Sequence, residues 1–396
     1  MIKALLFDLD DTLLVNSMNT FLPSYFGQLA REYPELSAGV VVGATQHAAA
    51  LAQSNQDPTT TLDQVFATAF TPRIGRPEAE WRARYASFYA TRFDTLQPLT
   101  DRRPEARDIL VWALNAGYRV VIATNALFPR AAVEARLRWA GVADLALARV
   151  TVLEDWHFAK PNPAYFAEIL ADLGLQPHET LMIGNDPHED VAAAASLGIP
   201  CWWVTDDTLT PAPEGVDLVG RGPLRAFGAW AQDCLKQLRR GPTPVTALPD
   251  LLAGSLARLW SELARLQALP TGWHTQPPND AWSANAIACH LRDVEIEVNG
   301  PRIAMVVTQD NPFIAGVDTD RWAFERDYAT ADGLAALEPF RQARLATITR
   351  LRALTATDYE RTARHALFGR TSLRELIQVI LDHDQVHLRE LRALNP

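Results

Sequence analysis

The sequence predicts an α/β part with a parallel sheet over residues 1–240, followed by an all-α four-helix bundle over residues 245–396. In the first part, strand-like apolar runs alternate with amphipathic helical stretches, a pattern that favours parallel strands covered by helices. In the second part, amphipathic helical patterns follow one another without a strand signal of comparable strength, which favours a bundle. Between them, the stretch LKQLRRGPTPVTALPD combines basic residues, Gly and prolines, as is typical of a domain boundary.

Five apolar runs in the first part each end in a polar turn. They are IKALLFDLDD, YRVVIATNA, ARVTVLEDW, TLMIGNDP and IPCWWVTDD. Helical stretches between them, such as NPAYFAEILADLGL, close on Gly, which is a common helix stop. Because active sites in such folds lie at the carboxyl ends of the strands, these turns should gather at one edge of the sheet.

Residues 15–100 interrupt the alternation with three helical patterns and no convincing strand. We expect a helical insertion that lies over the strand ends. Within it, Arg73 and Arg76 in FTPRIGR are candidates for contacting an anionic ligand, although a solvated turn is the simpler interpretation.

Four amphipathic patterns make up the second part, at residues 248–268, 283–299, 331–354 and 371–394. Their length suits a bundle in which each helix buries one apolar stripe.

Composition excludes several classes of function. A chain of 396 residues with 48% hydrophobic and 21% charged residues is that of a folded protein, and its net charge of −10 argues against a nucleic-acid partner. No apolar run approaches the roughly 18 residues that span a bilayer, and Asp8 interrupts the N-terminal run before a signal peptide could form. Cys201, Cys234 and Cys289 lack metal-type spacing, so we expect reduced thiols in a cytoplasmic protein with no membrane partner.

The run LLFDLDDTLL places Asp8, Asp10 and Asp11 directly after an apolar strand. For this triplet alone, a solvated turn is as good an interpretation as a functional site. The next strand end adds Thr124 and Asn125, whose hydroxyl and amide can donate to a phosphate oxygen, although Thr-Asn is also a common turn.

Two later segments favour a functional site over a solvated turn. Lys160, in FAKPNPAYF, can neutralise a phosphate and keep a carboxylate ionised, although most lysines are simply exposed. In LMIGNDPHEDVAAA, Asp186 and Asp190 lie one helical turn apart after another apolar strand, and such carboxylates suit Mg²⁺, which takes oxygen ligands.

In this order, the four segments resemble the motifs of the haloacid dehalogenase (HAD) superfamily, whose members are mostly phosphohydrolases. The resemblance covers about the first 240 residues and implies a Rossmann-like core, with residues 15–100 as its helical cap. Caps of this kind close over small phosphorylated metabolites and exclude water.

The resemblance also implies roles for individual residues. Asp8 would attack the phosphorus and form an aspartyl-phosphate, while Asp10 would protonate the leaving oxygen and later activate water. Thr124 and Lys160 would bind the phosphate oxygens, with Asn125 beside them as a substrate-binding residue. An acid at position 10 favours phosphate chemistry over dehalogenation, whereas Asp11 serves the turn.

The same resemblance implies a Mg²⁺ ion held by Asp8, Asp10 and the fourth motif. Family members commonly have Gly-Asp there, but this chain has Gly184-Asn185. Either Asn185 ligates the metal through its amide oxygen, or Asp186 takes that role and Asp190 orients Lys160 or a metal-bound water. We favour Asp186. In either case the departure from the family pattern predicts weaker Mg²⁺ binding or reduced turnover.

Three histidines of the second part suggest a second metal. His383 and His387, in LDHDQVHLREL, are four residues apart on one predicted helix and so face the same way. His290, in WSANAIACHLRDVE, lies on an earlier helix that antiparallel packing can bring alongside. Three imidazoles and an open position form a typical catalytic or ligand-binding metal site, although a histidine pair alone is more often a surface feature.

The pattern W-S…HL-DVE with HD--H near the end resembles the DinB-like (YfiT-like) four-helix bundle family, over residues 245–396. The resemblance implies that His290, His383 and His387 bind Zn²⁺, Ni²⁺ or another divalent ion, and that Asp293 and Asp384 orient them. Family members with known activity include metal-dependent thiol transferases. His365 lies outside the motif, and Cys289 points away from the ligands and is expected in the core. These residues complete the candidate set.

Three functional hypotheses follow. The first is a two-domain enzyme whose front domain is a Mg²⁺-dependent phosphatase acting on a small phosphorylated metabolite. In the second, the bundle carries the main activity as a metal-dependent thiol transferase or hydrolase. In the third, the bundle is a non-catalytic module for binding or for forming a homodimer.

Overall fold

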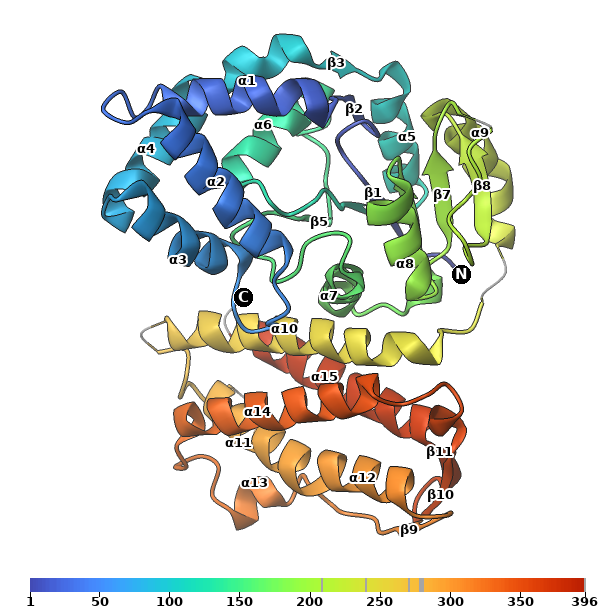
Figure 1. Cartoon of the computed structure of the whole chain (residues 1–396). Helices are drawn as coiled ribbons and strands as arrows, with labels where there is room; N and C mark the ends of the chain where they lie inside the picture. Colours follow the sequence, from blue (N-terminus) through green and yellow to red (C-terminus); the bar gives the residue numbers. More distant parts are fainter. Residues whose placement is uncertain (208, 239–240, 270, 278–280, 395–396) are drawn as a thin grey trace. The chain divides into compact units, whose positions relative to one another are not determined.

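The computed structural model describes residues 1–207, 209–238, 241–269, 271–277 and 281–394 (Figure 1). The chain divides into two compact units, residues 1–166 with 175–243 and residues 167–174 with 244–396. Among the helices within these described ranges, none has the length and apolar character needed to cross a membrane. The three cysteines are free thiols.

A six-stranded parallel sheet forms the centre of the first unit, in the order β5-β4-β1-β6-β7-β8. The strands are β1 (Ala4–Phe7), β4 (Arg119–Ile122), β5 (Arg149–Val150), β6 (Thr180–Gly184), β7 (Cys201–Val204) and β8 (Leu218–Gly222). All five predicted strands are therefore confirmed. Strand β8 was not predicted, because its sequence LVGRG contains two glycines, which are rare in strands.

Strand β1 lies between β4 and β6, and its four residues are all buried. Phe7 is in register with Ile122 on one side and with Ile183 on the other. Because all three strands run in the same direction, the polar turns that follow them meet at one edge of the sheet.

Helices connect the strands of this sheet. They are α5 (Pro104–Asn115), α6 (Arg130–Ala140), α7 (Pro163–Leu173) and α8 (Ala193–Ser196), and a further helix, α9 (Leu224–Cys234), follows the last strand. A π-helical turn, η3 (Pro187–Ala192), leads into α8 and carries the fourth motif. The alternation of strands and helices is thus the one predicted.

The predicted helical insertion is confirmed. It consists of α1 (Met18–Ala30), α2 (Ala38–Gln53), α3 (Leu62–Ile74), α4 (Glu78–Thr91) and the 3₁₀ segment η1 (Phe93–Leu99). Figure 1 shows α1 to α4 grouped together, well away from β7 and β8. The insertion begins and ends at a short antiparallel ladder between β2 (Leu14–Val15) and β3 (Asp101–Arg102). We call residues 14–102 the cap.

Long helices dominate the second unit, as predicted. They are α10 (Leu248–Gln267), α11 (Ala284–Val294), α14 (Gly333–Arg352) and α15 (Leu373–Ala393). Helix α11 packs against α14, and α10 packs against both α14 and α15. A short helix, α13 (Trp322–Glu325), precedes α14.

The helix predicted at residues 283–299 of the second unit does not end at residue 299. It continues through the π-helical turn η6 (Glu295–Asn299) into α12 (Gly300–Thr308). The Gly300 amide donates to the Glu295 carbonyl, five residues earlier. This wider turn lets the helix pass Pro301, which has no amide proton to donate, so the Gly-Pro pair is not the helix stop that its sequence suggests.

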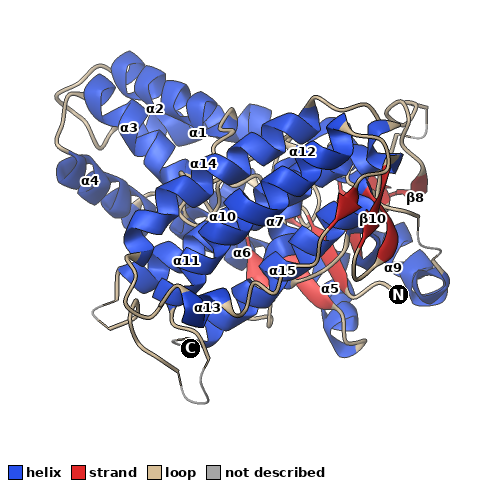
Figure 2. Ribbon diagram, turned by 90° about the horizontal axis from the view of Figure 1, so that it is seen from below, coloured by secondary structure: helices blue, strands red, loops and turns tan. Residues whose placement is uncertain are grey.

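The second unit also contains three short strands that the sequence did not predict, β9 (Phe313–Ile314), β10 (Thr362–His365) and β11 (Gly369–Ser372). They form a sheet in the order β11-β10-β9, seen as red arrows around the β10 label in Figure 2. The sequences of β10 and β11, TARH and GRTS, are mostly polar and so lack the apolar runs that marked the strands of the first unit.

Candidate active site and candidate metal centre

A buried lysine joins two carboxylates at the edge of the parallel sheet. Asp8 directly follows β1, and Asp190 lies in η3 after β6. Lys160 Nζ donates to Asp8 Oδ1 at 2.8 Å and to Asp190 Oδ1 at 2.5 Å, with its own side chain 1% exposed. Burial acts to lower the pKa of Lys160, but Asp190 and Asp8 raise it well above its usual value. The lysine therefore stays charged and holds Asp8 in place.

Gly184 leaves room for this contact. A Cβ at residue 184 would lie 2.3 Å from Asp190 Oδ2, so no larger residue fits there without moving the carboxylate. The Asp186 amide also donates to Asp190 Oδ2 at 3.0 Å. Asp190 is thus fixed on both of its oxygens, and its position toward Lys160 follows from the local fold.

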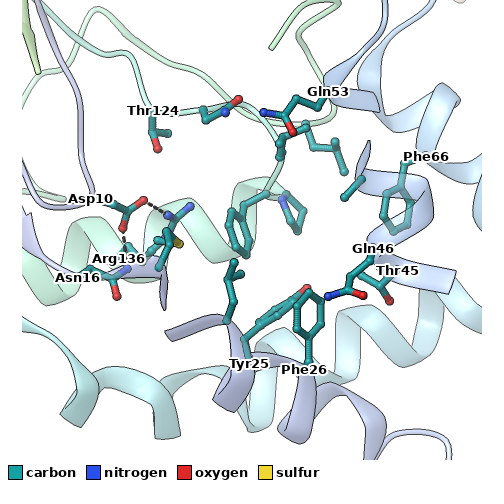
Figure 3. A pocket seen from close by; sticks show the side chains of 18 of the residues that line it. Asp10, Asn16, Tyr25, Phe26, Thr45, Gln46, Gln53, Phe66, Thr124 and Arg136 are labelled. Carbon is teal, nitrogen blue, oxygen red and sulfur yellow. Dashed lines mark hydrogen bonds and ion pairs between the residues drawn. The ribbon is translucent and has the colours of Figure 1, made fainter. Parts of the chain in front are cut away.

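Asp10 is held by a residue that the sequence did not indicate. Asn16 Nδ2 donates to Asp10 Oδ1 at 2.7 Å, and Arg136 Nη1 donates to Asp10 Oδ2 (Figure 3). Arg136 lies on α6, is fully buried and sits over the ring of Phe128, 4.5 Å from its centroid. Burial raises the pKa of Asp10, and the charge of Arg136 opposes that rise. No local pattern marks Arg136, because its partner is 126 residues away.

The fourth motif turns Asn185, and not Asp186, toward Asp8. One terminal atom of the Asn185 amide group lies 3.1 Å from the Asp10 carbonyl oxygen and from Thr12 Oγ1, and 3.2 Å from Asp8 Oδ2. Asp186 Oδ1 instead accepts the amides of His188 and Glu189, both at 2.7 Å. It therefore caps the first turn of η3.

Thr124 and Asn125 follow β4 at the same edge. The Thr124 carbonyl accepts hydrogen bonds from Thr151 Oγ1 at 2.6 Å and from the Tyr165 hydroxyl at 2.7 Å, which fixes the backbone there. Asn125 Nδ2 donates to Glu189 Oε2 at 3.1 Å, so its amide group faces η3. Asp11 accepts from the Asn16 amide at 3.0 Å in a left-handed conformation with φ of 57°, as expected of a turn residue.

These residues meet at one end of a cavity of about 770 Å³ that extends into the cap. Asp8, Asp10, Thr124, Asn125 and Asn185 all line it. The two arginines of the FTPRIGR segment are absent from its lining, and Arg76 pairs with Glu35 at 3.1 Å. The structure therefore does not support a role for that segment in binding a ligand in this cavity.

The three predicted histidines converge in the second unit. His290 Nε2 lies 3.0 Å from His383 Nε2, and His387 Nε2 lies 3.1 Å from the same atom. Burial, and secondarily His387, lowers the pKa of His290 to about 3 and that of His383 to about 4. Nitrogens about 3.3 Å apart are expected around a tetrahedral Zn²⁺ with bonds of about 2.0 Å. The arrangement therefore suits a divalent ion bound by neutral imidazoles.

The predicted orienting residues are wrong. Asp293 accepts from Arg292, Arg326 and Tyr328, whereas Asp384 accepts from Ser255 and Arg344. Both aspartates are thus occupied by other partners. Glu390 lies 2.7 Å from His387 Nδ1 instead, one helical turn further along α15. Its spacing of three residues from His387 was the signal that could have revealed it.

His365 and Cys289 stay outside this centre, as predicted. His365 lies on β10, is 4% exposed, and accepts the Leu367 amide through Nδ1 at 3.1 Å. Cys289 is fully buried beside Tyr328 and Ala336. Both are structural residues.

Comparison with protein families agrees with this division of the chain. Residues 2–198 match the model of the haloacid dehalogenase-like hydrolases, and residues 229–391 match that of the DinB superfamily. The chain therefore contains a haloacid dehalogenase-like hydrolase domain at residues 2–198 and a DinB superfamily domain at residues 229–391.

Individual relatives of the first domain include two phosphatases. A phosphoserine phosphatase of Thermus thermophilus is 30% identical over 163 residues, which are 41% of this chain and 62% of that enzyme. A glyceraldehyde 3-phosphate phosphatase of Methanothermobacter thermautotrophicus is 24% identical over 228 residues, 56% of this chain and 93% of that enzyme. The crystal structure of a HAD phosphatase from Thermococcus onnurineus is 20% identical, with a TM-score of 0.38 over 57% of this chain and 96% of the other. The match to the first of these relatives thus spans less than two thirds of its length.

Proposed function

We propose that the first domain is a Mg²⁺-dependent phosphatase that hydrolyses a phosphate monoester through an aspartyl-phosphate on Asp8. The observation that carries the proposal is the convergence of Asp8, Asp10 and Asn185 at one end of a cavity, with the buried Lys160 bound to Asp8 at 2.8 Å. Phosphoryl transfer needs a nucleophile, a proton donor and charge neutralisation in one place, and this group supplies them. The phosphatases among the relatives support the same reaction class.

In the first step, the Asp8 carboxylate forms a bond to phosphorus while the ester P–O bond breaks. Protonated Asp10 gives its proton to the departing oxygen, so the alcohol leaves neutral. In the second step, Asp10 takes a proton from a water molecule whose oxygen attacks the phosphorus. The acyl phosphate bond then breaks, releasing inorganic phosphate and free Asp8.

Two cationic residues prepare these groups for their roles. Lys160 offsets the charge of Asp8 and of the phosphoryl group that it receives. Arg136 and Asn16 bind the two oxygens of Asp10 and fix its direction. Asp10 must lose and regain a proton in each cycle, so a carboxyl group with a raised pKa suits the task.

The donor atoms present fit a Mg²⁺ ion. Asp8 Oδ2 and the Asp10 carbonyl oxygen lie 3.2 and 3.1 Å from the Asn185 amide nitrogen, which donates to both. Mg²⁺ takes oxygen ligands, so with an ion bound the amide would present its oxygen to it instead. We assign Asn185, through its amide oxygen, as the third ligand, because Asp186 Oδ1 caps η3 and Asp190 is bound to Lys160. When bound, the ion would screen the repulsion between the carboxylates and the incoming phosphate.

A pair of aspartate variants in one loop tests the reaction. Phosphate release from a simple phosphate ester is measured with and without Mg²⁺ for the wild type, Asp8→Asn and Asp11→Asn. Removal of a nucleophile typically costs about 10³-fold or more in turnover. Asp11→Asn should retain most activity, because Asn adopts the left-handed conformation of residue 11 and can still accept the Asn16 amide. Equal activity of Asp8→Asn and the wild type contradicts the proposal.

For the second domain, we propose a divalent metal site, Zn²⁺ or Ni²⁺, formed by His290, His383 and His387. Support comes from the three Nε2 atoms that face one another and from the lowered pKa values of His290 and His383, which keep these two imidazoles neutral and able to bind an ion. The Glu390 carboxylate beside His387 Nδ1 would fix the tautomer that leaves Nε2 free.

A further inference from the structure

We propose that the alcohol portion of the substrate is an uncharged, largely apolar group, with an aromatic ring as the best fit, and that it lies against the cap. This inference rests on the proposed phosphatase function and specifies the substrate class of the same site. It is more specific than the small phosphorylated metabolite that the family resemblance implies.

The cap end of the cavity is formed mainly by aromatic side chains. Seven line the cavity: Tyr25, Phe26, Phe66, Trp81, Tyr85, Tyr89 and Phe128. They pack edge to face on one another, for instance Tyr25 on Phe128 with centroids 5.5 Å apart. In Figure 3, Phe66, Tyr25 and Phe26 lie across the cavity from Asp10 and Arg136. The cavity therefore has a polar end for the phosphate and an aromatic end for the rest of the ester.

The tyrosine hydroxyls of this wall are already paired. The hydroxyls of Tyr25 and Tyr89 lie 2.8 Å apart, and that of Tyr85 lies 3.0 Å from Thr45 Oγ1. Thr45 Oγ1 in turn donates to the Val41 carbonyl at 2.8 Å. Burial raises the pKa of Tyr25 to about 12, so its ring stays neutral. One hydroxyl hydrogen of the Tyr25–Tyr89 pair is left over, so the wall offers a ligand mainly ring surface, which favours an apolar or aromatic partner.

The cations that line the cavity are bound to carboxylates. Among the described residues these cations are Arg82 and Arg136. Arg82 donates to both oxygens of Asp63, at 2.9 and 2.7 Å, and to Glu78 at 2.7 Å. Arg136 is bound to Asp10 at the polar end. A substrate carboxylate at the cap end would therefore meet Arg82, which is already paired, and the acids Asp63 and Glu154, at a cost in desolvation.

Gln46 supplies one uncharged polar group at this end. It extends from α2 toward the cavity in Figure 3, and its side chain is exposed. A residue in this position can be changed without disturbing the buried wall, so it offers a way to alter the charge that the substrate meets.

Three esters of primary alcohols test the proposal: propyl phosphate, 3-phenylpropyl phosphate and 3-carboxypropyl phosphate. Their leaving groups are chemically alike, so differences in kcat/KM report the remote part of each molecule. Burial of a phenyl ring removes roughly 100 Å² of apolar surface from water, so we expect kcat/KM for the phenylpropyl ester to exceed that of the propyl ester about ten-fold or more. The carboxypropyl ester should fall below the propyl ester. Equal values for the propyl and phenylpropyl esters overturn the proposal.

A binding measurement tests this inference independently of the proposed reaction. The same three esters are titrated calorimetrically against Asp8→Asn in the presence of Mg²⁺. If the wild type hydrolyses none of them, the proposed reaction fails, while the titration still decides the inference. Tighter binding of the phenylpropyl ester than of the propyl ester supports it, and equal or weaker binding overturns it.

A matched pair of variants at residue 46 adds a second test. Gln46→Lys places a cation at the cap end, whereas Gln46→Met keeps a similar length without charge. We expect Gln46→Lys to raise kcat/KM for the carboxypropyl ester relative to the propyl ester about ten-fold, through one new ion pair, and Gln46→Met to leave this ratio unchanged. An unchanged ratio in Gln46→Lys places the alcohol portion elsewhere and overturns the proposal.

Discussion

The two candidate sites balance their polar groups in different ways. At the sheet edge, Lys160 and Arg136 neutralise Asp8, Asp190 and Asp10. In the bundle, three imidazoles face one another, and the Nδ1 atoms of His290 and His383 are buried without a hydrogen-bond partner in the described residues. The first site is therefore assembled by its own ion pairs, whereas the second lacks a group that would make three facing nitrogens favourable. This difference supports our proposal that a divalent ion binds between the three imidazoles of the second centre.

The largest effect is expected when the three-histidine site of the second unit loses one of its ligands. His383→Ala leaves two imidazoles and should abolish stoichiometric binding of a divalent ion, measured by elemental analysis of the purified protein. The control is His274→Ala, which removes an exposed histidine from the same unit and should leave the ion content unchanged. Equal ion content in His383→Ala and the wild type would rule out a metal site formed by His290, His383 and His387.

The next largest effect concerns Arg136. Arg136→Met removes the cation from Asp10, so we expect kcat to fall about 10- to 100-fold, within the range that acid–base catalysis contributes. KM should change little, because the residue acts through Asp10. Arg136→Lys restores the charge and should recover part of the loss. A rise in KM with unchanged kcat would instead mean that Arg136 binds the substrate directly.

A smaller effect is expected at Asn185. Asn185→Asp adds a carboxylate beside Asp8, and a charged ligand binds Mg²⁺ more tightly than an amide. The Mg²⁺ concentration that gives half-maximal activity should fall about ten-fold. If it stays the same or rises, residue 185 is not a metal ligand, and the contrast between the two sites must be revised.

The smallest effect is expected at Asp186. Because Asp186 caps η3 and Asn caps helices about as well, Asp186→Asn should change the Mg²⁺ requirement and kcat by less than about three-fold. The Mg²⁺ titration used for Asn185→Asp gives the comparison. A large loss of Mg²⁺ affinity here would restore Asp186 as the ligand favoured from the sequence.

Sequence reasoning was most successful where chemistry and local pattern coincide. Asp8 and Lys160 each lie in a strand-end or turn motif that can be read without the fold, and the structure brings them to 2.8 Å from one another. His383 and His387 share one helix, so their common direction follows from helical periodicity alone. The five strands and the long helices of both units were also predicted correctly, because their apolar patterns are local in the sequence.

What sequence reasoning missed depends on tertiary contacts. Arg136 gains its role only from contact with Asp10, and its own helix has an ordinary amphipathic sequence. The preference for Asp186 over Asn185 came from the family resemblance and the spacing of Asp186 and Asp190, whereas the fold decides which of two neighbouring side chains faces Asp8. Likewise, the helix that runs through Gly300 and Pro301 requires a π-helical turn, which no propensity scale predicts.

The ladder between β2 and β3 links the cap to the loop that carries Asp8 and Asp10. Because Leu14 pairs with Arg102 and Val15 with Asp101, the two strands that connect the cap to the sheet are hydrogen-bonded to each other. Next to the ladder, Arg103 Nη2 donates to the Asp11 carbonyl at 2.7 Å. Any opening of the cap must pivot about this double connection and pull on the turn between Asp10 and Thr12. We therefore expect that substrate entry past the cap is coupled to the position of Asp10, the residue proposed as acid and base.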